Sequence, residues 1–148
     1  MKTWFDSEER IDALVSESSS WLGTPFRANA AFKGSGVCCH LFVAEVFMAI
    51  GAVPRQDFPK ADPNHSISQR DSLIEPFMAS MPGFVEVEEP PIPGDILGFK
   101  IGGCTHHLAI VLRGEEMIHA VRRHGVMINR WDDPMWAKRL TLNWRLKP

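Results

Sequence analysis

Residues 36–47 read Gly-Val-Cys-Cys-His-Leu-Phe-Val-Ala-Glu-Val-Phe, and this stretch decides how the rest of the chain folds. A glycine-bearing loop ends here, and the almost continuous apolar run that follows predicts a helix buried on all sides. Cys39 lies at the start of that helix, where unpaired backbone N–H groups and the helix dipole favour a thiolate. Because the thiolate is the nucleophilic form, we expect Cys39 to be the nucleophile of a cysteine hydrolase. Cys38, about 100° away around the same helix, is expected to be structural.

Two histidines on later strands are the candidate partners of this thiol. His107 opens an apolar strand over residues 107–112, and His119 lies near the end of a strand over residues 116–121. In an antiparallel hairpin the start of the first strand lies beside the end of the second, so these imidazoles are expected to be neighbours. We therefore expect His107 to activate the thiol and His119 to orient His107 and fix its tautomer. The competing interpretation is a core cysteine with a structural histidine pair.

The other histidines carry weaker signals. Because side chains alternate along a strand, His106 is expected to point away from His107 and to be exposed. His40, His65 and His124 are likewise expected to be exposed. The cysteines and histidines have the right chemistry for zinc, but their spacing matches no zinc motif, so no metal and no cofactor is expected.

Composition narrows the function further. The chain has 148 residues, consistent with a single domain over 1–148, and its 16 basic and 18 acidic side chains give a formal net charge of −2. This balance argues against nucleic acid or an anionic membrane as a partner, and no apolar run reaches the ~20 residues of a membrane helix. The acidic N-terminus does not resemble a secretory signal, so synthesis in the cytoplasm with reduced thiols is expected.

The apolar periodicity changes midway along the chain. Helices are expected at residues 8–22, with Ser7 as N-cap, at 39–50, and at 68–81, the last kinked or split by Pro76. Segments 26–36 and 55–66 are expected to be irregular, and the tryptophans are expected in the core or at its rim. Short strands are expected at 84–87, 95–101, 107–112, 116–121, 126–130 and 140–146, with a loop or one helical turn at 131–136. Helices followed by antiparallel strands predict an α+β domain with N-terminal helices packed on a C-terminal sheet.

Five segments, taken together, resemble the NlpC family of papain-like cell-wall cysteine peptidases. Residues 21–26 are similar to its Leu-Gly-Thr-Pro-Tyr segment and residues 36–43 to its Asp-Cys-Ser-Gly-Leu-Val box, with Cys39 on the nucleophile. Residues 93–99 resemble its Pro-Gly-Asp strand, and residues 107–111 its His-Val-Gly-Ile strand, with His107 on the base. His119 falls on the family's third polar position.

The resemblance implies a papain-like fold, a Cys-His-His triad and peptidoglycan stem peptides as substrate, cleaved at a γ-D-glutamyl-diamino acid bond. The short form looks most like small peptidases of phage-tail and gene-transfer-agent clusters. This implies phage-tail or secretion-machine partners, with virion delivery, lysis or a dedicated secretion machine as routes to a cell wall.

The surroundings of the nucleophile depart from the family pattern. Cys38 replaces Asp, His40 replaces Ser, Leu41 replaces Gly and Phe26 replaces Tyr. Phe26, Cys38, His40 and His106 are the candidate pocket residues. The departures leave two alternatives open: an inactive structural module that keeps the fold, and a thiol amidase or esterase acting on another substrate.

Overall fold

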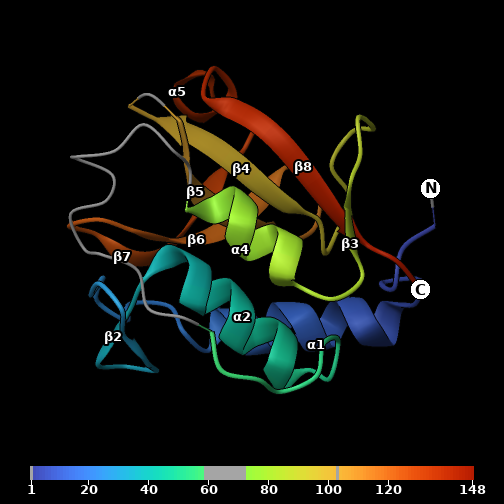
Figure 1. Ribbon diagram of the computed structural model, residues 1–148, viewed down its shortest axis with the longest axis horizontal. Coiled ribbons are helices and arrows are strands. Elements are labelled where there is room, and N and C mark those ends of the chain that lie inside the picture. Colours follow the sequence, from blue (N-terminus) through green and yellow to red (C-terminus); the bar gives the residue numbers. More distant parts are fainter. Residues whose placement is uncertain (1, 59–72, 103) are drawn as a thin grey trace.

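The computed structural model describes residues 2–58, 73–102 and 104–148, which form helices packed against a mostly antiparallel sheet (Figure 1). The helices are α1 (Glu8–Ser19), α2 (Cys39–Ala49), α4 (Ile74–Ser80) and α5 (Pro134–Ala137). The strands are β1 (Ala31–Phe32), β2 (Gly36–Val37), β3 (Phe84–Glu86), β4 (Ile96–Ile101), β5 (Cys104–Val111), β6 (Glu116–Val121), β7 (Gly125–Arg130) and β8 (Leu140–Leu146). The predicted α+β class is confirmed.

Six strands form one antiparallel sheet in the order β3-β8-β4-β5-β6-β7, and β1 and β2 form a separate hairpin. Helix α2 packs on β5 and β6, α4 packs on β5, and α1 packs behind α2 (Figure 1). The sheet therefore presents one face to the helices, and α2 is the helix at the centre of that contact.

The main core lies between α2 and the sheet. Phe42, Val43 and Phe47 of α2 are fully buried, and they belong to the same apolar cluster as Leu108 and Ile110 of β5. Burial of a Val, Leu or Phe side chain contributes about 1.5–3 kcal/mol, so the all-apolar run after Cys39 fixes α2 in place.

A second, smaller apolar cluster covers the opposite face of the sheet. It contains Phe99 of β4, Ala109 and Val111 of β5, and Trp136 of α5. Because side chains alternate along a strand, His107 faces the same side as Ala109 and Val111. His107 therefore lies on the face of the sheet that the second cluster covers.

A buried ion pair ties the segment before β4 to β8. The carboxylate of Asp95 accepts two hydrogen bonds from the guanidinium of Arg145, at 2.9 and 2.8 Å, and one from Asn143 at 3.0 Å. The Ile92 N–H donates to the same carboxylate at 3.0 Å, and Arg145 also donates to Glu89. Asp95 and Arg145 are both fully buried, so the charge of Asp95 depends on Arg145 for its compensation, while Arg145 is paired with Glu89 as well.

Several predicted elements differ from those observed. Segment 26–36 is not wholly irregular, because β1 and the start of β2 pair within it. Within the described residues, α4 begins at Ile74 and continues through Pro76, which lies in its first turn, where backbone N–H groups need no helical partner. Residues 68–72 and His65 lie outside the described residues. The Ser7 cap is confirmed, with its hydroxyl accepting from the Arg10 N–H.

Candidate active site

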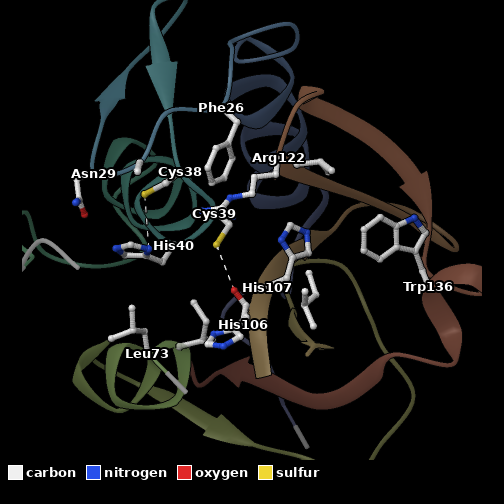
Figure 2. A pocket seen from close by; sticks show the side chains of 14 residues that line it. Phe26, Asn29, Cys38, Cys39, His40, Leu73, His106, His107, Arg122 and Trp136 are labelled. Carbon is white, nitrogen blue, oxygen red and sulfur yellow. Dashed lines mark hydrogen bonds between the residues drawn. The ribbon is translucent and has the colours of Figure 1, made fainter. Parts of the chain in front are cut away.

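Cys39 is the first residue of α2, and Cys38 is its N-cap. The approach to the helix is held by backbone hydrogen bonds, from the Val37 N–H to the Pro25 carbonyl and from the Cys38 N–H to the Ala30 carbonyl. The Cys39 side chain is 9% exposed, and its Sγ donates to the carbonyl of His106 at 3.7 Å (Figure 2). The thiol at the helix start is thus hydrogen-bonded to strand β5.

The thiol differs from the sequence-based expectation in its charge state. Burial raises the pKa of Cys39 to about 12, and the neighbouring Cys38 thiol adds to the increase. Backbone hydrogen bonds at Leu108 of β5, and at His40 and Cys39 of the helix start, act in the opposite direction but do not compensate for the lost hydration. Burial thus acts against the thiolate that a helix start was expected to favour.

The two histidines and an asparagine form a hydrogen-bonded chain. Nε2 of His107 lies 2.8 Å from Nδ1 of His119, and Nε2 of His119 lies 2.8 Å from Oδ1 of Asn129 on β7. An amide oxygen only accepts, so His119 carries its proton on Nε2 and accepts on Nδ1 from the Nε2–H of His107. Nδ1 of His107 is consequently the basic nitrogen.

Burial keeps both imidazoles neutral. It lowers the pKa of His119 to about 4, and it lowers the pKa of His107 well below its ordinary value, with the neighbouring His119 adding to the shift. Burial therefore favours the neutral form of the thiol and of both imidazoles.

Trp136 of α5 covers the histidine pair. Its ring stacks on His107 at a centroid distance of 5.5 Å and meets His119 edge-on at 4.8 Å. The ring of Phe99 packs against both His107 and Trp136. These contacts hold His107 in one orientation. Trp136 was expected in the core or at its rim, and it lies in the second apolar cluster, but its contact with the histidines was not predicted.

Cys39 and His107 open into one cavity of about 210 Å³ (Figure 2). The four candidate pocket residues also line it: Phe26, Cys38, His40 and His106. The structure thus gathers the seven sequence-predicted site residues in one region, with His119 behind His107 rather than at the cavity wall.

Two expectations about exposure are wrong. His106 is half-buried and lines the cavity, and the register between β4 and β5 shifts at this point, where Phe99 pairs with His107 and Lys100 with Thr105. His40 is half-buried, packs on Phe77, and its pKa is lowered by burial to about 4.

Cys38 lines the cavity beside Cys39, as expected of a candidate pocket residue, although its place on the helix was expected to turn it away from Cys39. The 100° rotation does not apply, because Cys38 has an extended backbone and lies outside the helix. Its Sγ lies 3.6 Å from Nδ1 of His40 (Figure 2).

Asn129 is the site residue that sequence reasoning missed. His119 of β6 pairs with Met127 of β7. Asn129 lies two residues after Met127 on β7, and therefore on the same face of the sheet. Alternation across the predicted hairpin could have pointed to it.

Within residues 2–58, 73–102 and 104–148, no three His, Cys, Asp or Glu side chains lie where they could hold a metal ion. Over the same residues, no helix is long and apolar enough to cross a membrane.

Comparison with known proteins places this geometry in a family. The model of the NlpC/P60 family matches residues 23–145, and the chain therefore belongs to the NlpC/P60 family. Murein DD-endopeptidase MepS/Murein LD-carboxypeptidase of Escherichia coli strain K12 is 22% identical over 128 residues, which are 85% of this chain and 57% of that protein. The chain thus spans a little over half the length of the curated relatives that it matches.

Solved structures show the same fold. An NLP/P60 family protein similar to a lipoprotein, from Staphylococcus aureus Mu50, has a TM-score of 0.67 at 18% identity, over 100% of this chain and 45% of that one. RipD from Mycobacterium tuberculosis, described as a non-catalytic NlpC/p60 domain protein adapted to peptidoglycan binding, has a TM-score of 0.55 at 12% identity, over 94% of this chain and 98% of that one. The predicted fold is confirmed, and the family includes both hydrolases and a non-catalytic member.

Proposed function

We propose that this chain is a cysteine hydrolase that cleaves an amide bond in peptidoglycan stem peptides, with Cys39 as nucleophile, His107 as base and His119 as the residue that orients the base. The observation that carries the proposal is the hydrogen-bonded chain from His107 through His119 to Asn129. The His107 end of this chain lines the same cavity as Cys39. A nucleophile, a base and a group that orients the base are the parts that acyl transfer requires.

The first step begins from the neutral pair. The basic Nδ1 of His107 takes the proton of the Cys39 thiol as sulfur attacks the carbonyl carbon. The imidazolium is stabilised through its Nε2–H, which donates to His119 at 2.8 Å. The backbone N–H of Cys39, at the first position of α2, is the candidate donor to the oxyanion.

The remaining steps return the site to its resting state. The tetrahedral intermediate collapses, the C–N bond breaks, and His107 gives its proton to the leaving amine. A water molecule, deprotonated by His107, then attacks the thioester; the carboxylic acid leaves, and sulfur recovers the proton. Trp136 stacked on His107 keeps the imidazole in the same place through both halves of the reaction.

The bond that we propose as substrate is the amide between γ-D-glutamate and a diamino acid. Family membership and the murein endopeptidase among the relatives support peptidoglycan as the polymer. That relative is named as a DD-endopeptidase and LD-carboxypeptidase, so the choice of the γ-D-glutamyl bond rests on the resemblance of the sequence motifs alone. The resemblance to phage-tail and gene-transfer-agent peptidases stays a prediction, which a search for the protein in purified particles would test.

The test is hydrolysis of a γ-D-glutamyl-diamino acid tripeptide, followed by liquid chromatography and mass spectrometry. We expect turnover by the wild type and its loss, by at least 1,000-fold, in Cys39→Ala and His107→Ala. His124→Ala is the matched control, because His124 is exposed in the β6–β7 turn and should retain full activity. Unchanged hydrolysis in Cys39→Ala would show that the assignment is wrong.

One observation favours a second candidate function, that of a non-catalytic peptidoglycan-binding module. The Cys39 thiol is buried, its pKa is raised to about 12, and it is bonded to a carbonyl instead of to an imidazole. This candidate predicts that stem peptides bind without being cleaved, and that Cys39→Ala leaves binding unchanged. A thiol hydrolase with another amide or ester substrate predicts Cys39-dependent turnover of that substrate only.

A further inference from the structure

The charge of the cavity beside Cys39 indicates which stem peptides it takes. Among the described residues that line the cavity, none is Asp or Glu, and Arg122 carries the only permanent charge. Of the histidines there, burial lowers the pKa of His40 to about 4 and that of His107 well below its ordinary value, so these two do not compete with the arginine. The lining is otherwise mostly apolar, including Phe26 and Trp136.

The backbone that carries Arg122 is fixed in place. Arg122 directly follows β6, and the turn closes where Val121 pairs with Gly125. The same turn docks on the segment before Phe26: the Val126 N–H donates to the Thr24 carbonyl at 2.9 Å, and the Gly23 N–H donates to the Val126 carbonyl at 3.1 Å. An arginine on a held turn can take a defined place beside the reacting group.

The Arg122 side chain is directed toward the reacting group. Figure 2 shows Arg122 extending from the β6–β7 turn toward Cys39, next to Phe26. Arg122 is exposed at the cavity rim, and its guanidinium presents a planar fork that matches a carboxylate in two-point hydrogen bonding.

We infer that Arg122 is a specificity-determining residue that binds a free carboxylate of the substrate next to the scissile amide. This inference rests on the proposed function and deepens it. When D-glutamate is linked through its γ-carboxyl group, its α-carboxylate stays free and lies a few bonds from the scissile carbonyl. Stem peptides in which this α-carboxylate is amidated present a neutral carboxamide at the same position. The cavity therefore selects the glutamate form over the isoglutamine form.

The experiment compares two stem tripeptides that differ only in this group, one with γ-D-glutamate and one with D-isoglutamine. Binding to Cys39→Ala, which cannot turn over, is measured by calorimetry. We expect the carboxylate peptide to bind about 10- to 100-fold more tightly than the amide peptide, the range for hydrogen bonds to a charged group. Adding Arg122→Gln should remove this preference by weakening only the carboxylate peptide, and Arg122→Lys should retain part of it.

The control is Arg123→Gln, which removes the neighbouring charge from a side chain that is exposed and does not line the cavity. It should leave both affinities within twofold. Equal affinity for the two peptides, undetectable binding of both, or a preference that survives Arg122→Gln would overturn the inference.

Hydrolysis by the wild type is measured in parallel, with the preference expected in KM more than in kcat. Selective binding that depends on Arg122 but without Cys39-dependent hydrolysis would remove the proposed function and keep the binding role of Arg122. Hydrolysis of both peptides at equal kcat/KM would keep the proposed function and remove the specificity role of Arg122.

Discussion

The reactivity of Cys39 in the absence of substrate follows from the burial of its thiol, and it can be calculated. With a pKa of about 12, the thiolate fraction at pH 7 is about 10⁻⁵, against about 3% for an ordinary thiol of pKa near 8.5. A more basic thiolate is a better nucleophile, and this recovers roughly 40-fold of the ~3,000-fold deficit. Alkylation of Cys39 by iodoacetamide at pH 7 should thus be about 100-fold slower than alkylation of an unstructured cysteine peptide.

The assay is the rate of Cys39 carbamidomethylation from pH 5.5 to 10, followed by mass spectrometry in a Cys38→Ala background that removes the adjacent thiol. The rate should rise about tenfold per pH unit across the whole range, without a plateau. His107→Ala should change it by less than about threefold, since the wild-type imidazole is neutral. A plateau below pH 7 that His107→Ala abolishes would indicate a standing thiolate–imidazolium pair and would refute the reasoning.

Two further predictions concern pH and stability. Because burial lowers the pKa of His119 to about 4 and that of His107 well below 6.5, the base stays unprotonated into the acid range. Thus kcat/KM should be nearly constant from pH 6.5 down to about 5.5 and decline as the pH falls through the lowered values; a half-maximal point near 6.5 would contradict this. Arg145→Met leaves the buried Asp95 carboxylate unpaired and should cost about 3–5 kcal/mol in urea unfolding, or roughly 10–15 °C in Tm. The exposed Asp132, paired with an arginine, is the control: Asp132→Ala should cost less than about 1 kcal/mol, and equal losses would argue against a buried pair.

The sequence was sufficient to predict the parts of the site that depend on periodicity. The apolar run after Cys39 predicted a buried central helix, and α2 is that helix. The alternating strands around residues 113–115 predicted the hairpin that brings His107 and His119 together, and the observed pairing of Ile110 with Ile118 is consistent with it. Both signals come from the local repeat of apolar residues, which a single sequence displays directly.

The parts that sequence reasoning missed depend on tertiary packing. His106 lines the cavity at a point where the register between β4 and β5 shifts, and such a shift has no local composition signal. Trp136 reaches His107 only because α5 folds over the far face of the sheet.

The thiol shows the same dependence on packing. Its position at a helix start was predicted, but its pKa follows from burial, which depends on how closely β5 approaches Cys39. The local electrostatic argument therefore gave the wrong sign.

The central claim is that Cys39 forms a covalent bond to a stem-peptide acyl group, and intact-protein mass spectrometry tests it most directly. The wild type is mixed with excess γ-D-glutamyl-diamino acid tripeptide and quenched in acid within the first turnovers, and any adduct is located by peptide mapping. The account predicts a mass increase equal to the acyl portion of the peptide, located on Cys39, absent from Cys39→Ala, and lost as hydrolysis is completed. The account would be contradicted if the wild type turned over the peptide without an adduct on Cys39 and if Cys39→Ala turned it over as well.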